Sequence, residues 1–201
     1  MVASTAGLDD PGLPGDEPRR GRSALFVALA VGAVLVALIA LLATGPTGDR
    51  TVSSPLIGRP APATAGTSIV GDAEFDLADA DGRYTLVNFF ATWCPPCIVE
   101  HPELVRFAAA GEARGDARVV TVVLQDDPRA VQRFFEREGG DWPVLDDPGG
   151  RLAVAWGVAQ PPESYLVGPE GTVRAKIIGG ISATELDELL ARVQAGDGVT
   201  R

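Results

Sequence analysis

Two cysteines separated by two prolines, in the stretch NFFATWCPPCIVEHPEL (residues 88–104), constrain this chain more than any other feature. They are the only cysteines in 201 residues, and they follow directly after an apolar run, YTLVNFF (84–90). A short run so rich in aromatic and branched side chains predicts a buried β-strand. A helical pattern continues from Cys94 to about Ala110, so the thiols lie at the carboxyl end of a strand. Open α/β sheets place their chemistry at this end.

The rest of the pattern predicts an α/β domain. Strand, helix, strand and helix are followed by a hairpin and a last helix, which implies parallel strands, an antiparallel pair and helices on the faces of a mixed sheet. Capping signals mark the start of two helices. DDP (126–128) offers an N-cap with Pro128 at the first helical position, and SATE (182–185) is a capping box. The elements expected after the first helix are a strand at 117–124, helices at 128–138 and 151–156, a hairpin of 164–167 with 172–178, and a helix that begins near Ser182.

The first part of the chain predicts a membrane anchor. Three arginines, at 19, 20 and 22, precede ALFVALAVGAVLVALIALLA (24–43), which carries no charge. Twenty residues at about 1.5 Å per residue cover the roughly 30 Å hydrocarbon core of a bilayer. The arginines place residues 1–22, a Gly- and Pro-rich disordered tail, in the cytoplasm and the rest of the chain outside.

A cleaved signal peptide is the alternative to an anchor spanning residues 23–43, and it would release a secreted form. Its apolar core is usually shorter, and a small-x-small cleavage site follows it. Here Leu41 stands three residues before Thr44. Under either interpretation the folded part lies outside the cytoplasm, where disulfides form.

The remaining chain divides into a Gly/Ser/Thr/Pro linker (44–58), one domain (59–195) and a short tail (196–201). The net charge of −10 makes a nucleic-acid partner unfavourable, because such a surface repels phosphates.

Several interpretations of the cysteine pair can be compared. A structural disulfide that closes so short a loop stabilises little. Zinc needs at least three protein ligands. The sequence offers only Cys94, Cys97 and its single histidine, His101, and all three lie within one segment, which makes a zinc site unfavourable. Haem attachment needs CxxCH, but residue 98 is Ile, and the PxxxT/SxxC pattern of a peroxidatic cysteine is also absent. We therefore expect no metal and favour a redox couple.

The redox interpretation explains the position of both thiols. If Cys94 caps the helix, its sulfur meets the positive end of the helix dipole and becomes a better thiolate. Cys97, one turn later, can close a disulfide with it. Because Pro95 and Pro96 have no N–H, only the Cys97 N–H remains among the first donors. A less stabilised thiolate favours the disulfide form, so we expect a reductant.

The segment LVNFFATWCPPCIVEHPEL resembles the active-site segment of membrane-anchored thioredoxin-like proteins of the TlpA/ResA/CcmG (DsbE) type. FDLADADGRYTLVNFF is similar to that family's usual lead-in, and GVAQPPESYLVGPEGTVRAKIIGG to its GVxGxPETFLIDxxGxI segment. The resemblance covers roughly residues 56–194. It implies a thioredoxin fold and thiol–disulfide exchange without a cofactor. ResA and CcmG types reduce the CxxCH disulfide of apocytochrome c, and a CcdA-like membrane thiol relay supplies their electrons.

The resemblance also implies roles for individual residues. Pro162 matches the family's cis-proline, which faces the CxxC and helps to form the partner groove, and Trp93 is expected to wall one side of the site. Pro161 departs from the pattern, since it offers a partner backbone only its C=O. We expect a groove that holds its partners with one hydrogen bond fewer. The family's usual PxF lead-in is not clearly present in APATAGTSIVGDAEF (61–75), so this sequence does not define the N-terminal hairpin.

Glu100 matches the family acid that tunes thiol ionisation and shuttles protons. By geometry alone it is an i,i+3 neighbour of Cys97, and a solvated carboxylate is the alternative. Asn88 stands where cytoplasmic thioredoxins carry a buried Asp, which leaves Glu100 as the nearby carboxylate. His101 is expected at the surface or its boundary and not in catalysis.

The sequence therefore predicts an extracytoplasmic thiol–disulfide reductase with Cys94 as nucleophile and Cys97 as resolving thiol, serving cytochrome c maturation. One alternative keeps this chemistry but has other exported proteins as clients, reduced or oxidised. Another is a tethered binding module with an inert disulfide. An inert bridge would be buried, so the exposure of Cys94 is expected to separate these interpretations.

Overall fold

A computed structural model describes residues 20–43, 51–79 and 81–196 of the chain. The chain forms two compact units, Met1–Thr47 and Gly48–Arg201. The expected disordered tail up to residue 19, residues 44–50 of the expected linker and residues 197–201 of the expected C-terminal tail lie outside the described residues.

The first unit contains one helix, α1 (Arg20–Ala43), which begins at the arginines that the sequence assigns to the tail. Its side chains are described for residues 25–40, and all of these are exposed. In the parts of the chain that the structure describes, no helix meets the length and apolarity required to cross a membrane.

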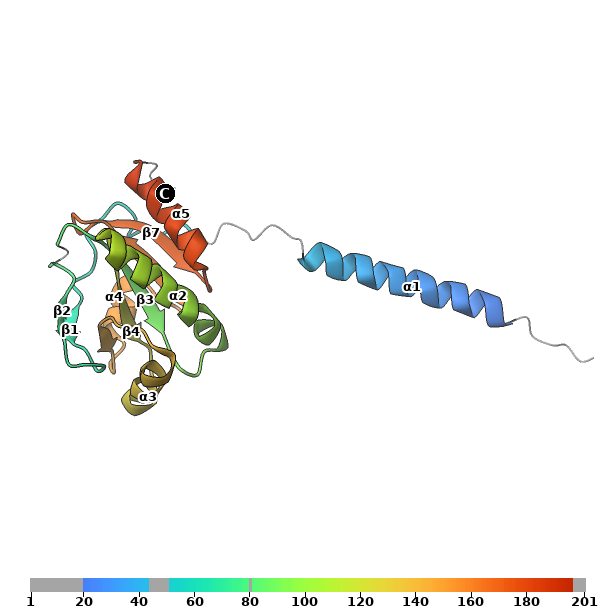
Figure 1. The fold of residues 1–201 in the computed structure, drawn as a ribbon, viewed down its shortest axis with the longest axis horizontal. Coiled ribbons are helices and arrows are strands. Elements are labelled where there is room, and N and C mark those ends of the chain that lie inside the picture. Colours follow the sequence, from blue (N-terminus) through green and yellow to red (C-terminus); the bar gives the residue numbers. More distant parts are fainter. Residues whose placement is uncertain (1–19, 44–50, 80, 197–201) are drawn as a thin grey trace, which may run out of the picture. The chain divides into compact units, whose positions relative to one another are not determined.

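The second unit is built on a five-stranded mixed sheet with the strand order β5-β4-β3-β6-β7 (Figure 1). The central strand β3 pairs in parallel with β4 on one side and antiparallel with β6 on the other, while β5 extends the parallel part and β7 the antiparallel part. The bounds are β3 Tyr84–Phe90, β4 Ala117–Val123, β5 Val144–Asp146, β6 Glu163–Val167 and β7 Val173–Ile178. The expected mixed α/β sheet is confirmed.

Four helices follow or connect these strands: α2 Pro95–Arg114, α3 Pro128–Glu138, α4 Arg151–Trp156 and α5 Ala183–Gln194. The capping signals in the sequence act as expected, since Asp127 caps α3 and Ser182 forms a capping box with Glu185 at α5. Helix α2 runs four residues beyond the expected end and stops at Gly115, whose left-handed backbone (φ 70°) suits glycine.

Apolar side chains fill both faces of the sheet. One core gathers residues of α2, α3 and α5, and Figure 1 shows α2 and α5 lying over the same face of the sheet. The other core gathers Trp156 of α4, Phe75 and side chains of the central strands. Both cores consist only of residues from the second unit, so the domain of residues 48–201 holds what it needs to fold by itself.

Three short strands were not predicted from the sequence. A hairpin of β1 (Ala65–Thr67) and β2 (Glu74–Asp76) forms in the region where the family pattern is blurred, and β5 has only three residues. Such short strands carry too few residues to show a periodicity of two. Their pairing depends on contacts distant in sequence, such as the Ile69 N–H donating to the Val144 carbonyl at 2.8 Å.

Candidate active site

The two cysteines form a disulfide at the N-terminus of α2. Their Cα atoms lie 5.3 Å apart, and Cys94 is the N-cap residue of the helix. Pro95 and Pro96 occupy the first two helical positions, and the Cys94 sulfur accepts from the Cys97 N–H at 3.3 Å. The expected cap with a single donor is therefore present. The helix dipole points its positive end at this sulfur.

The disulfide is almost closed off from solvent, with Cys94 3% and Cys97 1% exposed. Burial is what the sequence analysis expected of an inert bridge, so exposure does not identify this disulfide as a redox couple. The residues on both sides of Cys94 explain its burial, because Trp93, Pro95 and Pro96 are exposed and lie outermost. A partner must approach the sulfur across these rings.

Glu100 is buried one turn after Cys97, with only 3% exposed. One carboxylate oxygen accepts from the Ile181 N–H at 3.2 Å, and the other lies 3.4 Å from the amide nitrogen of Asn88. That amide also donates to the Ser164 hydroxyl at 3.0 Å. The alternative of a solvated carboxylate is wrong, because Glu100 faces inward between β3, β6 and the loop before α5. Burial disfavours the charged form of a carboxylate, which suits a residue in this position to taking up a proton.

The Pro161–Pro162 bond is cis, as the resemblance implies. The Pro162 carbonyl accepts from the Gly179 N–H at 2.9 Å, which ties this loop to the end of β7. In the register of β3 and β6, Phe89 pairs with Glu163. Pro162 therefore lies at the sheet edge where β3 ends and the cysteine segment begins.

A buried ion pair supports the proline loop from behind. Glu163 lies 2.7 Å from the Lys176 ammonium, and its other oxygen accepts from the N–H groups of Ala159 and Gln160 at 2.9 and 3.2 Å. Lys176 also donates to the Gly157 carbonyl at 3.2 Å. Burial alone would lower the pKa of Lys176, but its interactions with Glu163 and Tyr165 outweigh burial and raise this pKa.

The loop after β4 holds the residues that precede Cys94. The exposed Trp93 donates its indole N–H to the Gln125 carbonyl at 3.2 Å, and the Thr92 N–H donates to the Asp126 carboxylate. Gln125 has a positive φ of 45°, a strained conformation for a residue other than glycine. Trp93 is thereby held at the edge of the site with 57% of its area exposed.

His101 does not lie at the surface, so that expectation is wrong. It is 2% exposed, its Nε2 lies 2.9 Å from the Gly139 carbonyl, and its ring packs against Phe90, Phe134 and Phe135. Burial lowers the pKa of His101, although the Gly139 carbonyl and Glu138 act in the opposite direction. The residue is part of the core beneath α3, because a neutral imidazole with one hydrogen bond packs well among aromatic rings.

Several residues near the site were not identified from the sequence. Ser164 and Ile181 contribute polar groups to the surroundings of Asn88 and Glu100, and Glu163 with Lys176 supports the proline loop. The signals were Glu163 at the start of one largely apolar strand segment and two charged residues, Arg174 and Lys176, in the next. Nothing in the sequence indicated Gln125 and Asp126. Their role depends on the loop after β4 lying next to Trp93 and Thr92 in the fold.

Comparisons with known proteins agree with this geometry. The Redoxin family model matches residues 56–190. The thiol:disulfide interchange protein DsbE of Allochromatium vinosum is 33% identical over 181 residues, which cover 81% of this chain and 92% of that protein. The thiol:disulfide interchange protein HelX of Rhodobacter capsulatus is 34% identical over 148 residues, covering 71% and 81%.

Solved structures show the same fold. A putative thiol:disulfide interchange protein DsbE from Chlorobium tepidum superposes with a TM-score of 0.61 at 26% identity, covering 67% of this chain and 95% of that one. A secreted Mycobacterium tuberculosis disulfide oxidoreductase, homologous to Escherichia coli DsbE, gives a TM-score of 0.56 at 26% identity, covering 64% and 94%. This chain belongs to the Redoxin family and is a thioredoxin-like thiol-disulfide oxidoreductase of the DsbE type.

Proposed function

We propose that this oxidoreductase works as a reductant outside the cytoplasm through the Cys94–Cys97 couple. The cap of α2 is the observation that carries the proposal, because the Cys94 sulfur accepts from the Cys97 N–H and the two prolines contribute none. Fewer donors stabilise the thiolate less, and a less stable dithiol form makes a couple more reducing.

In the proposed reaction the Cys94 thiolate attacks one sulfur of a client disulfide and forms a mixed disulfide. The other client sulfur leaves as a thiolate and takes up a proton. Cys97 then attacks the Cys94 sulfur, which releases the second client thiol and closes the Cys94–Cys97 bond. Glu100 accepts the Cys97 proton in this step, since it is the buried carboxylate one turn away.

Trp93, Pro161 and Pro162 form the proposed partner groove. The exposed Trp93 ring and the cis-proline loop both belong to the sheet edge from which the cysteine segment leaves. Pro161 can accept but cannot donate a backbone hydrogen bond, so a client strand binds with one bond fewer and leaves quickly. A Pro161→Ala variant restores the donor, and unchanged client affinity would contradict this part of the proposal.

We further propose apocytochrome c as the client, reduced at its CxxCH disulfide before haem attachment. The similarity of the cysteine and proline segments to ResA and CcmG types supports this choice of client. The electrons that restore the dithiol would come from a CcdA-like membrane thiol relay. General reduction of other exported proteins is the second candidate.

Residues 24–43 are proposed to hold the domain at the membrane as a single-pass anchor with a cytoplasmic N-terminus. Support comes from the uncharged run that follows three arginines, and from the large apolar side chains between Leu25 and Ile39, which are at least 50% exposed. Alkaline extraction of membranes from cells that make the full chain tests the anchor. Retention in the pellet is expected, whereas a soluble, shortened chain would indicate cleavage.

A trapping experiment tests the chemistry and the client together. A Cys97→Ser variant of residues 48–201 cannot resolve its mixed disulfide, so mass spectrometry should find it joined through Cys94 to an oxidised CxxCH peptide. The Cys94→Ser variant should form no such adduct. The same peptide with His replaced by Ala measures client preference, and equal rates would favour the general reductase. No adduct with any disulfide peptide would contradict the proposed reaction.

A further inference from the structure

A cavity of about 690 Å³ lies at the end of the sheet opposite the cysteines. Its lining includes Arg83, just before β3, and Arg118, the second residue of β4. The cysteine segment follows the last residue of β3, and a seven-residue strand at about 3.3 Å per residue separates the two ends by roughly 20 Å. The cavity is therefore not part of the thiol site.

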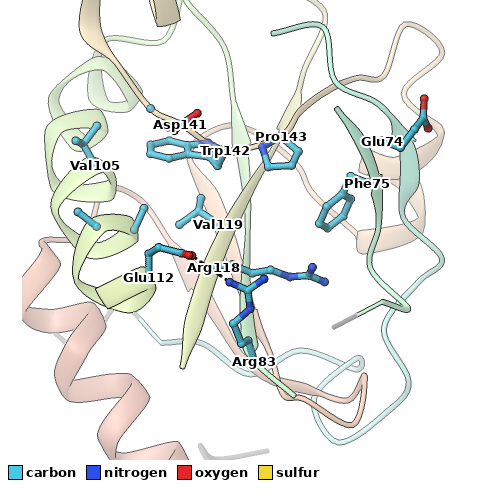
Figure 2. Close-up of a pocket in the computed structure, with 13 residues that line it drawn as sticks. Glu74, Phe75, Arg83, Val105, Glu112, Arg118, Val119, Asp141, Trp142 and Pro143 are labelled. Carbon is cyan, nitrogen blue, oxygen red and sulfur yellow. Dashed lines mark hydrogen bonds and ion pairs between the residues drawn. The ribbon is translucent and has the colours of Figure 1, made fainter. Parts of the chain in front are cut away.

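The cavity exists because the edge of β4 is only partly covered. Strand β5 pairs with β4 from Thr121 onward, and Pro143, just before β5, has no N–H with which to extend the ladder toward Val119. Figure 2 shows that Phe75, on β2, and Val105, on α2, lie on opposite sides of this open edge. With Trp142 and Pro143 they give the cavity mostly apolar walls.

Arg118 brings a charged group with an unused donor into this wall. Its Nε donates to the Thr85 hydroxyl at 2.9 Å, and its guanidinium carbon lies 5.1 Å from the centre of the Phe75 ring. Its Nη2 is buried and has no hydrogen-bond partner. Buried donors of this kind are nearly always satisfied in folded proteins, so an unpaired guanidinium nitrogen calls for an acceptor.

Two arginines and three acids line the cavity, so an anion would be held by Arg118 itself and not by an overall positive charge. Arg83 lies beside Arg118 in Figure 2 and pairs with Glu112 at 3.0 Å. Burial lowers the pKa of Arg118 and the neighbouring charge of Arg83 lowers it further, whereas the carboxylates of Asp81, Asp79 and Asp76 act in the opposite direction. Of the other acids in the lining, Glu74 is hydrogen-bonded to Thr67, while Asp141 is exposed. Arg83 also lies 3.7 Å from the Asp81 carboxylate, so Arg118, with its unpaired Nη2, is the group that would hold an anion.

We propose that this cavity binds a small organic anion, a carboxylate carried on an apolar or aromatic body. The volume falls within the roughly 300–1,000 Å³ of small-molecule pockets, which combine apolar walls with a few polar groups. The planar guanidinium of Arg118 is suited to a carboxylate, and the apolar Phe75 and Trp142 would contact the body of the ligand. The site is independent of the client of the cysteines.

Amide NMR of residues 48–201 tests the proposal, with 4-phenylbutyrate as the probe. Trp142 lines the cavity and donates its indole N–H to the Thr121 hydroxyl at 2.9 Å, whereas Trp93 and Trp156 lie elsewhere. The Trp142 indole signal should shift on titration, and the other two indole signals should stay in place. A ligand of this size is expected to bind with a Kd on the order of 1 mM.

Two comparisons separate a carboxylate site from a merely apolar hollow. The neutral amide of the same ligand should bind the unchanged protein at least about tenfold more weakly, as a lost charge-assisted pair predicts. An Arg118→Gln variant should bind the carboxylate equally weakly, while Arg106→Gln, an exposed arginine on α2 outside the lining, should bind it as before. The proposal would be overturned if the Trp142 indole signal did not shift at a ligand concentration about tenfold above the expected Kd. Equal affinity for the acid and the amide would overturn it as well.

Discussion

Glu100 and His101 are consecutive buried residues of α2, but they face different surroundings. Glu100 meets the polar groups of Asn88 and the Ile181 N–H, close to the disulfide. His101 meets aromatic rings on the side of α3. The two residues therefore allow separate tests of chemistry and of stability.

Replacing Glu100 by Gln should slow disulfide exchange without unfolding the domain. The amide keeps the shape and can still accept from the Ile181 N–H, but it cannot take the Cys97 proton. Positioned proton transfer contributes about 10²–10⁴-fold to rates, and we expect a loss of at least about tenfold at pH 7.

Stopped-flow measurement of exchange between pH 5 and 9 checks this prediction. The variant should be slower than the original over this range, because it has lost the group that accepts the Cys97 proton. Glu136→Gln, an exposed change on α3, is the matched control and should leave the profile unaltered. A Glu100→Gln profile that overlays the original would show that the carboxylate has only a structural role.

His101 should make the domain less stable in mild acid. Its pKa is lowered by burial in the folded state, so below its ordinary value near 6.5 the unfolded chain binds a proton that the folded chain resists. Stability from this residue is fully present above pH 6.5 and is lost as the pH falls toward the folded pKa. The slope is at most about 1.4 kcal/mol per pH unit.

Urea unfolding of the original domain and of His101→Gln at pH 7.5 and 5.5 measures this contribution. Glutamine retains a donor for the Gly139 carbonyl but does not titrate. The free energy of unfolding should therefore fall less between the two pH values in the variant. Identical changes in both proteins would mean that His101 is protonated as easily in the fold as out of it.

At the scale of elements, the N-terminus of α2 sets the reducing power of the couple. Pro96 stands at the second helical position, whose N–H would normally reach the cap sulfur, and Pro95 stands at the first, whose N–H would not. A Pro96→Ala change restores a donor to the Cys94 thiolate. We expect the reduction potential to rise by about 30 mV or more, the equivalent of one hydrogen bond to a charged group.

Equilibration of both single variants with glutathione buffers tests the cap argument. Pro95→Ala is a matched control, since it makes the same substitution in the same dipeptide and should leave the potential nearly unchanged. If the reduction potential shifts equally in both variants, the stiffness that the prolines give the chain, and not the missing hydrogen-bond donor, determines the potential of the couple.

The strands β6 and β7 are joined by the Glu163–Lys176 ion pair, which should be a major contributor to the stability of the proline loop. Lys176→Met leaves the buried Glu163 carboxylate without its cation and should cost about 3 kcal/mol in urea unfolding. The double variant Glu163→Gln with Lys176→Met should recover part of this loss, because no charge is then left buried. A loss below about 0.5 kcal/mol in the single variant would mean that solvent reaches the pair.

At the scale of the whole molecule, the elements that carry strong local signals could be predicted from the sequence. Strand 84–90 and helices 128–138 and 151–156 agree residue for residue, since apolar runs, caps and glycines define them locally. The short β1, β2 and β5 could not be predicted, because their partners are distant in the chain. The burial of His101 and the links of Ser164 and Asp126 to the site depend on tertiary packing in the same way.

The most direct test of the account is the reduction potential of the Cys94–Cys97 couple in residues 48–201, measured by equilibration with defined thiol buffers and trapping of free thiols. The capped sulfur with a single donor predicts a value near or below that of thioredoxin, about −270 mV. A value near −120 mV, as in strong oxidants, would contradict the proposed reductant and point instead to disulfide formation in exported proteins.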